Sequence, residues 1–279
     1  MTSPRALVLS GYGLNCDFET QYALQLAGFE AERVHISQLL REHVSADEVR
    51  SLADFHLLAF DGGFSWGDDH GAGVLLATRL KYKLQEELEG FIGSGKLIIG
   101  ICNGFQAMVN MGLLPGFEGR YDSREVALLA NDCGNFRNDW IHLEINPAAP
   151  CLFTRGLDKM ELPIRHGEGK FYAPEAVLKR LLENNQAALH YSLPSGEKAR
   201  GRFPYNPNGS LEDIAGICDP TGRIFGLMPH PEAFHHWTQH PDWTLKKENK
   251  KRKGQPIEEE EGAGLKIFKN AFEYLAKNF

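Results

Sequence analysis

Residues 96–106 read Lys-Leu-Ile-Ile-Gly-Ile-Cys-Asn-Gly-Phe-Gln and combine two structural signals. The apolar, β-branched run Leu97–Ile101 predicts a buried strand, and the helix-forming residues Gln106–Val109 follow it closely. Cys102 lies between these segments, with a glycine two residues before it and another two residues after it. A nucleophile on a tight strand-to-helix turn is exposed where backbone N–H groups converge. The stretch therefore predicts an α/β fold in which Cys102 is a nucleophile.

The bulk composition limits the class of protein. The chain has 279 residues, enough to bury a sizeable core, and its 42% hydrophobic content is typical of a soluble globular protein. Its net charge of −7 argues against a nucleic-acid partner, which would require a basic face. No secretory signal and no apolar run of roughly 20 residues is present, so no membrane partner is expected. The five cysteines are widely spaced, which favours a reducing cytoplasm.

Strand and helix patterns alternate over the first hundred residues. The alternation predicts a mostly parallel sheet flanked by helices, with ligands bound at the carboxyl ends of the strands. Asp17 is a plausible N-cap for one helix, and Ser45 with Glu48 forms a capping-box pattern for another. The predicted strands are Ala6–Ser10, Glu32–Ile36, His56–Phe60 and Leu97–Ile101, and the predicted helices are Asp17–Ala27, Ser45–Leu52 and Thr78–Ile92.

The second half is less helical and predicts an additional small antiparallel element. No linker-like composition divides the chain, so residues 5–279 are expected to form a single domain. Residues 235–264 differ, because a lysine-rich run is followed by Glu258–Glu261, and such blocks are usually solvated and mobile. They are expected to form a charged insertion before a closing amphipathic helix at Gly264–Phe279. The predicted strands are Glu125–Ala130, Trp140–Ile145, Leu162–Arg165, Ala187–Tyr191, Ile214–Ile217 and Arg223–Met228.

A base and a carboxylate stand far downstream of the cysteine. Residues 229–232 read Pro-His-Pro-Glu and follow an apolar run, which places His230 at another strand end. His230 could take the proton of Cys102, and Glu232 could orient the imidazole and stabilise its charged form. Taken separately, the cysteine could be a core residue and the Pro-His-Pro-Glu a simple turn. Together they favour a Cys102–His230–Glu232 triad.

Acyl transfer also needs donors for an oxyanion. The N–H of Asn103 is one candidate, and Gly62–Gly63–Phe64 at the end of the predicted strand His56–Phe60 is the other. Cys16 follows the first strand and could line the same crevice, although a structural role is the simpler interpretation. The segment Arg165–Lys170 could recognise the charged end of a substrate or could be a surface loop.

No metal or nucleotide cofactor is expected in this chain. His230, His235, His236 and His240 fit no common zinc spacing and no cysteine accompanies them. The sequence Gly-Tyr-Gly at residues 11–13 lacks the third glycine and the acidic residue of a dinucleotide fingerprint. The chain also has no glycine-rich phosphate loop.

These motifs resemble the class I (triad) glutamine amidotransferases, which have a flavodoxin-like sheet. Within that family the similarity is to the glutaminase subunits of phosphoribosylformylglycinamidine synthases. It rests on Cys-Asn-Gly-Phe-Gln at 102–106, Gly-Gly-Phe-Ser-Trp-Gly-Asp at 62–68, Asn-Cys-Asp at 15–17 and His-Gly-Glu-Gly at 166–169. Asp61 departs from the pattern, since the family usually has proline there, and so does Gly-Tyr-Gly-Leu at 11–14.

The resemblance implies a reaction and a set of partners. Cys102 would attack the side-chain amide of glutamine, His230 would protonate the departing ammonia, and water would hydrolyse the thioester. The ammonia would pass to a large synthetase subunit that uses ATP and Mg²⁺ in purine biosynthesis, with a small subunit bridging the two. The implied oxyanion and glutamine-binding residues are Gly62, Gly63, Phe64, Asn103, Gln106, His166 and Glu168.

Two alternatives stay open at this point. The chain could be the glutaminase subunit of another synthase, such as one of pyridoxal phosphate or histidine biosynthesis. It could also be a non-catalytic scaffold that keeps the amidotransferase fold. The identity of the large subunit would decide the first alternative, and the reactivity of Cys102 would decide the second.

Overall fold

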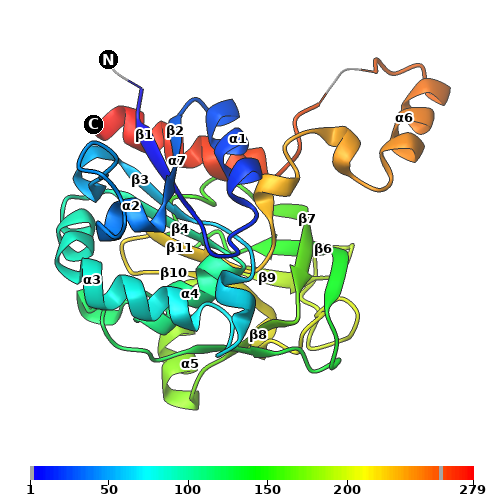
Figure 1. The fold of residues 1–279 in the computed structure, drawn as a ribbon. Coiled ribbons are helices and arrows are strands. Elements are labelled where there is room, and N and C mark those ends of the chain that lie inside the picture. The colour runs from blue at the N-terminus through cyan, green and yellow to red at the C-terminus, as the bar shows by residue number, and fades with distance from the viewer. Residues whose placement is uncertain (1–2, 258–259) are drawn as a thin grey trace.

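A computed structural model describes residues 3–257 and 260–279, and a mixed sheet runs through its centre (Figure 1). Within these residues the strand order is β2-β1-β3-β4-β11-β10-β9-β6-β7, and β5 pairs with β8 separately. The strands are β1 (Arg5–Ser10), β2 (Glu30–His35), β3 (Leu57–Phe60), β4 (Leu97–Ile101), β5 (Ala127–Ala130), β6 (Arg137–Ile145), β7 (Lys159–His166), β8 (Glu168–Tyr172), β9 (Ala187–Ser192), β10 (Ile214–Cys218) and β11 (Ile224–Leu227).

The first half of the sheet is parallel and its central strands are fully buried. β3 and β4 consist almost entirely of apolar residues, as expected for strands covered on both faces. Phe60 pairs with Gly100, and Leu227 pairs with Ile101, so β3, β4 and β11 end at the same edge. The residues that follow these strands, including Gly62, Cys102 and His230, are thereby brought to one edge of the sheet.

The second half of the sheet is antiparallel. β10 pairs antiparallel with both β11 and β9, and β6 pairs antiparallel with β9 and β7. The expected α/β fold with an antiparallel addition is confirmed, although the addition is larger than the sequence indicated. It continues the main sheet, and β5 and β8 form a further two-stranded ribbon.

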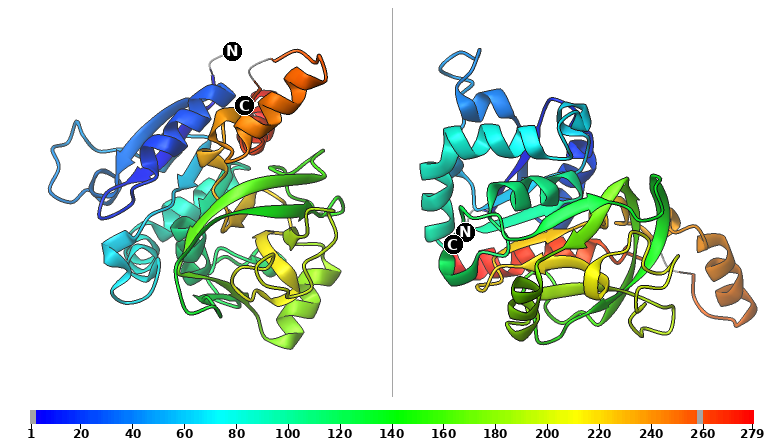
Figure 2. Two further views of the ribbon diagram at one scale, coloured as in Figure 1. Left: turned by 90° about the vertical axis from the view of Figure 1, so that its right-hand side faces the viewer. Right: turned by 90° about the horizontal axis from the view of Figure 1, so that it is seen from below.

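Helices cover both faces of the parallel half (Figures 1 and 2). α1 packs against α7 on one face, and α3 packs against α4 on the other. The closing amphipathic helix is α7, which buries Leu265, Phe268 and Leu275. The helices are α1 (Asp17–Ala27), α2 (Ile36–Leu40), α3 (Val74–Gly93), α4 (Asn103–Met111), α5 (Glu175–Glu183), α6 (Trp243–Arg252) and α7 (Leu265–Asn278).

Several local predictions are wrong. Residues 45–51 form a turn and irregular chain rather than an α-helix, and a short 3-10 helix begins at Leu52, although Ser45 donates both its N–H and its hydroxyl to Glu48. Residues 45–48 are exposed, and a short helix that buries no face is only marginally stable. Asp17 is the first residue of α1, and Cys16 takes the N-cap position instead. The segments β8 and α5 were not predicted.

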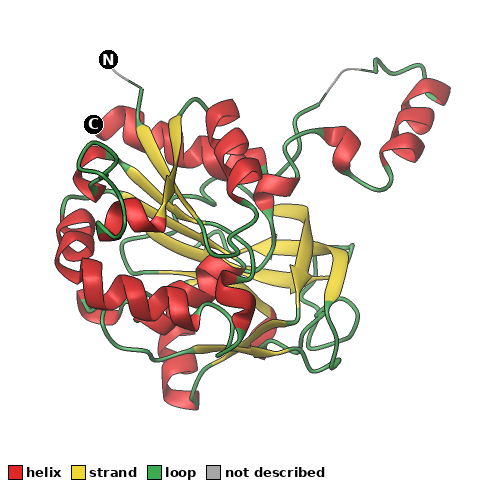
Figure 3. Ribbon diagram, viewed as in Figure 1, coloured by secondary structure: helices red, strands yellow, loops and turns green. Residues whose placement is uncertain are grey.

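The segment before α7 stands away from the body of the molecule (Figures 1 and 3). It contains α6, which has no buried residue. Glu258 and Glu259 of the predicted acidic run lie outside the described residues. Among the described helices, none is long and apolar enough to cross a membrane.

Candidate active site

Cys102 occupies a strained turn between β4 and α4. Its φ of 50° and ψ of −106° lie outside the common regions for a non-glycine residue. The turn is held from both sides, because Cys102 N–H donates to the Leu227 carbonyl at 2.8 Å and Gln106 N–H donates to the Cys102 carbonyl at 3.0 Å. This is the geometry of the predicted nucleophile elbow, which presents a side chain at the carboxyl edge of the sheet.

Gly104 is a position of the elbow where there is no room for a side chain. A Cβ on this residue would lie 1.9 Å from the carbonyl oxygen of Phe60 in the neighbouring strand β3. The first turn of α4 therefore packs directly on the backbone of β3. The local sequence Gly-x-Cys-x-Gly permits this close approach, and the approach positions the thiol.

His230 follows β11 and is paired with Glu232. Its N–H donates to the Pro163 carbonyl at 2.8 Å, and Nδ1 lies 2.5 Å from Oε1 of Glu232. Both side chains are almost fully buried. Burial alone would lower the pKa of His230, but the Glu232 carboxylate together with the neighbouring Cys102 and Cys16 side chains outweighs it and raises this pKa well above the ordinary value. The positive charge on the imidazole is thus stabilised.

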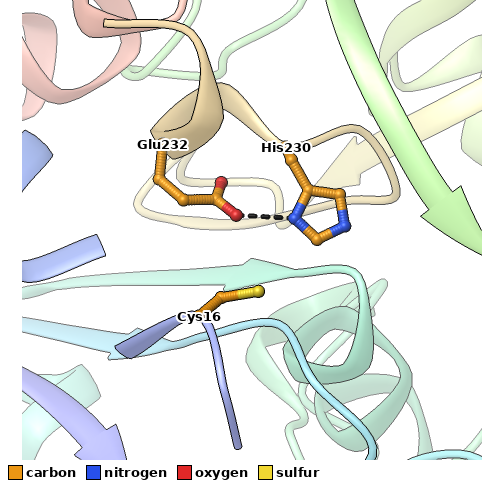
Figure 4. Close-up of side chains that lie close together, drawn as sticks. All are labelled: Cys16, His230 and Glu232. Atoms are coloured by element: carbon orange, nitrogen blue, oxygen red, sulfur yellow. Dashed lines mark hydrogen bonds and ion pairs between the residues drawn. The ribbon is translucent and has the colours of Figure 1, made fainter. Parts of the chain in front are cut away.

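Cys16 lies in the same cluster, which agrees with the prediction that it could line the crevice. Its thiol, a ring nitrogen of His230 and a carboxylate oxygen of Glu232 lie within 4.8 Å of one another (Figure 4). The Cys16 N–H donates to the Gly62 carbonyl at 3.1 Å, which ties the end of β1 to the end of β3. Burial raises the pKa of the Cys16 thiol, and the neighbouring His230 ring offsets this only in part.

A cavity of about 240 Å³ opens at this edge of the sheet. Its wall includes two oppositely charged side chains, Arg165 and Glu19, whose nearest N and O atoms are 3.4 Å apart. The rings of Phe64 and Phe136 lie at its rim with centroids 6.1 Å apart. The lining residues are Asn15, Cys16, Glu19, Gly63, Phe64, Cys102, Phe136, Asn138, Arg165 and His230.

Gly62 borders the site without lining this cavity. A Cβ at this position would lie 2.8 Å from Cε1 of His230 and 3.1 Å from the Cys16 sulfur. The residue therefore leaves room for the imidazole. Of the residues predicted to bind glutamine or its oxyanion, Gly63 and Phe64 face the cavity.

Asn103 and Gln106 point into the protein instead. Their amides form a buried chain, since Asn103 Nδ2 donates to Asp68 Oδ1 at 3.0 Å and to Gln106 Oε1 at 3.1 Å. Gln106 Nε2 donates in turn to the Glu168 carbonyl at 2.5 Å. These side chains join α4 to the loop after β3 and to β8. For Asn103, the group available for an oxyanion is thus its backbone N–H in the first turn of α4.

His166 and Glu168 also lie outside the cavity lining. Nδ1 of His166 lies 3.1 Å from Oδ1 of Asn131. Burial, and then the positive charge of His230, lowers the pKa of His166 to about 3, so its imidazole is neutral at physiological pH. Glu168 accepts a hydrogen bond from the N–H of Ala72 at 3.3 Å. Both residues support the loops around the site.

Asp61 is the buried neighbour of Gly62 and the position where the sequence departs from the family pattern. It is fully buried, and neither carboxylate oxygen has a hydrogen-bond partner among the described residues. Burial, followed by the negative charge of Asp17, raises its pKa well above the ordinary value. Burial at this position therefore favours the neutral form of the side chain.

Some lining residues were predicted only weakly from the sequence, and others were missed. Arg165 and Cys16 carried a weak signal, because each follows or ends a predicted strand beside polar residues. Glu19, Phe136 and Asn138 carried none, because an exposed residue of a helix, a loop or a strand end has no distinctive spacing.

The arrangement of these side chains suits thiol acyl transfer. A strained cysteine, a His–Glu pair and a charged, partly aromatic cavity at the carboxyl edge of a parallel sheet are suited to attack on an amide. Residues 3–275 match the family model of the CobB/CobQ-like glutamine amidotransferase domain, and the chain belongs to this family.

Similarity to curated proteins indicates one branch of this family. The chain is 46% identical over 274 residues to "Phosphoribosylformylglycinamidine synthase subunit PurQ" of Methanococcus maripaludis, with 98% of each chain covered. It is 45% identical over 276 residues to the protein of the same name from Dehalococcoides mccartyi, again with 98% of each covered. A chain of the solved structure "Structure of PurLQS from Thermotoga maritima" has a TM-score of 0.68 at 29% identity, covering 98% of this chain and 100% of that one. The family and branch indicated by the motifs are thus confirmed.

Proposed function

We propose that this chain is the glutaminase subunit of a cytoplasmic phosphoribosylformylglycinamidine synthase. It hydrolyses glutamine to glutamate and ammonia, and it delivers the ammonia to a separate synthetase subunit. The observation that carries the proposal is the Cys102 elbow beside the buried His230–Glu232 pair. The names of the relatives support the choice of synthase.

Glutamine binds with its zwitterionic end against Arg165 and Glu19. The guanidinium of Arg165 suits the substrate carboxylate, and the carboxylate of Glu19 suits its ammonium group. The aromatic rims of Phe64 and Phe136 cover the aliphatic part of the substrate. The side-chain amide then extends toward Cys102, on the inner wall of the cavity.

Acyl transfer begins when the Cys102 thiol gives its proton to Nε2 of His230. This nitrogen is buried and has no hydrogen-bond partner among the described residues, and the raised pKa of the imidazole favours the proton on the ring rather than on the sulfur. The sulfur forms a bond to the amide carbon, and the resulting oxyanion lies near the N–H groups of Asn103 and Gly63. The carbon–nitrogen bond breaks, His230 returns its proton to the leaving nitrogen, and ammonia departs.

A glutamyl thioester on Cys102 remains. His230 takes a proton from a water molecule, the water oxygen attacks the thioester carbon, and the carbon–sulfur bond breaks. The sulfur recovers its proton and glutamate is released. Glu232 keeps the imidazole oriented throughout and stabilises its charged form.

The ammonia passes to the partner proteins. A large subunit binds ATP and Mg²⁺ and converts formylglycinamide ribonucleotide to the amidine, and a small subunit bridges the two. The similarity to a chain of the Thermotoga PurLQS structure supports a complex of this kind. The alternative of a glutaminase for pyridoxal phosphate or histidine biosynthesis has no support among the relatives described above. The scaffold alternative predicts an unreactive Cys102.

Covalent labelling by a glutamine-mimicking diazoketone tests the proposal, with mass spectrometry to locate the modified peptide. The assembled complex should be labelled once, on Cys102, and glutamine should protect it. Cys133→Ser is the matched control and should be labelled as the wild type is. Labelling of another residue, or none in the presence of the large and bridging subunits, would refute the triad and favour a scaffold.

A further inference from the structure

A second cavity, of about 700 Å³, lies between the antiparallel half of the sheet and the segment that contains α6. Strands β6 and β7 and the loop after β9 form one wall, and α6 and the chain on either side of it form the other. This volume is within the range of small-molecule sites in proteins. The cavity shares no lining residue with the active-site cavity, and the proposed reaction does not use it.

The α6 residues that line this cavity all lie on one face of the helix. They are Lys246, Asn249 and Lys250, and Lys253 at the C-cap continues the same spacing of three and four residues. Side chains at this spacing lie one above the other along a helix. No residue of α6 is buried, so apolar packing does not explain its orientation. The helix instead turns a lysine face, formed by Lys246, Lys250 and Lys253, toward the cavity, and Lys251 lies outside the lining.

Three carboxylates also line the cavity, and each has a basic partner among the described residues. The pairs are Glu161 with Lys246, Glu260 with Lys250, and Glu261 with Lys269. Lys159 and Lys253 line the cavity as well, and neither is within ion-pair distance of a described carboxylate. The lining therefore has two positive charges that no described carboxylate neutralises.

Two uncharged groups in the wall are buried without a partner. The Ser192 hydroxyl and Nε1 of Trp237 have no hydrogen-bond partner among the described residues, although Ser192 is only 1% exposed. Both residues line the cavity. An indole N–H can only donate a hydrogen bond, so the partner that Trp237 lacks is an acceptor. Buried donors cost free energy unless they are satisfied, and a ligand with several acceptor oxygens would satisfy them.

We propose that this cavity binds a nucleoside phosphate, with its phosphate against the lysine face of α6. A phosphate group carries about −1.5 to −2 charges at neutral pH and three acceptor oxygens, which suit Lys250, Lys253 and the neighbouring neutral donors. The rings of Phe234 and Trp237 line the same cavity and suit a planar base. The site has no glycine-rich loop, and its residues come from distant parts of the chain, so no sequence motif marks it.

Isothermal titration calorimetry of the full-length chain with AMP, adenosine and ribose 5-phosphate tests this site. One AMP should bind per chain, and adenosine and ribose 5-phosphate should each bind at least about tenfold more weakly, because each lacks one half of the ligand. Lys253→Gln should weaken AMP binding by about tenfold, since it removes a charged donor. Trp237→Phe keeps an aromatic ring and removes the N–H, so it should weaken AMP binding by about two- to tenfold.

Lys251→Gln is the matched control, because it removes the same charge two residues away and outside the cavity lining. This variant should bind AMP as the wild type does, and circular dichroism confirms that each variant is folded. Absence of AMP binding, or an equal loss of affinity in Lys251→Gln and Lys253→Gln, would overturn the site. Equal affinity for AMP and ribose 5-phosphate would overturn the role of the aromatic rings, and equal affinity for AMP and adenosine would overturn that of the lysines.

This inference does not rest on the proposed function. Diazoketone labelling of Cys102 in the Lys253→Gln variant should match the wild type, because Lys253 does not line the active-site cavity. Loss of labelling with normal AMP binding would refute the glutaminase reaction alone. Normal labelling without AMP binding would refute the nucleoside phosphate site alone.

Discussion

Nδ1 of His230 lies 2.5 Å from Oε1 of Glu232, and only Pro231 separates the two residues in the chain. The contact is buried on all sides, and it sets which ring nitrogen faces Cys102. A local sequence motif thus produces a complete orienting pair, while the nucleophile comes from a different strand end. The proposed reaction depends on this pair for the orientation of the imidazole.

Substitution of Glu232 by glutamine should remove the negative charge and leave the volume nearly unchanged. Because the imidazolium formed during the reaction would lose its partner, the turnover number for glutamine hydrolysis should fall by about 10³–10⁴-fold. Ammonia-dependent synthesis by the assembled complex should persist, since it bypasses this site. Steady-state assays with glutamine and with ammonium salts measure both.

Glu161→Gln is the matched control for that experiment. Glu161 Oε2 lies 2.5 Å from Nε2 of His240, which is a similar histidine–carboxylate contact outside the active site. The turnover number of Glu161→Gln for glutamine hydrolysis should stay within about twofold of the wild type. Similar turnover in both variants would remove Glu232 from the mechanism.

Gly104→Ala should destabilise the fold, since its Cβ would meet the Phe60 carbonyl oxygen at 1.9 Å. Backbone atoms cannot move aside cheaply, so the free energy of unfolding should fall by about 1–3 kcal/mol or more. Urea denaturation monitored by tryptophan fluorescence measures the change. Gly90→Ala serves as the control, because nothing lies within 4 Å of its Cβ position in α3. That variant should be more stable than the wild type by about 0.5–1 kcal/mol, and a similar loss in both variants would contradict close packing at Gly104.

Asp61→Asn should stabilise the protein, and by more at higher pH. The pKa of Asp61 is raised in the folded state, so the folded chain holds a proton that the unfolded chain releases above its ordinary value of 3.8. The wild type therefore loses stability as pH rises from that value toward the folded pKa, whereas an asparagine does not titrate. Urea midpoints at about pH 5 and about pH 8 give the comparison. A gain that does not grow with pH would show that Asp61 is ionised in the folded protein.

Replacement of residues 243–253 by a Gly/Ser segment of equal length should leave the fold intact. No residue of α6 is buried, and its contacts include exposed ion pairs such as Lys246–Glu161, which contribute about 0–1 kcal/mol. The free energy of unfolding should change by less than about 1 kcal/mol. Phe268→Ala in α7 is the contrasting control, because this ring is fully buried and its loss should cost about 3–5 kcal/mol. A loss of that size on replacing α6 would show that the predicted insertion is part of the core.

The amino-acid order alone predicted the parallel half of the fold and the three residues that we propose as a triad. Strand β4 has the predicted bounds, Leu97–Ile101. An apolar run rich in β-branched residues is typical of a strand that is buried on both faces, so its limits can be seen in the sequence. The elbow was predictable because glycines at fixed offsets around a cysteine are a local geometric requirement. His230 and Glu232 were predictable for the same reason, because the local chain keeps residues at positions i and i+2 close together.

Which other side chains meet at this edge of the sheet depends on contacts between distant strands. Cys16 reaches His230 because β1 and β3 are neighbours in the sheet, and Arg165 reaches the cavity because β7 crosses toward the ends of β4 and β11. Asn103 and Gln106 belong to the predicted motif, yet the packing of α4 turns their amides away from the cavity. Residues 45–51 carry a capping pattern, yet with no apolar face to bury they stay irregular. Local spacing sets the conformation of a short segment, whereas contacts between distant segments depend on sheet order and register, which periodicity does not encode.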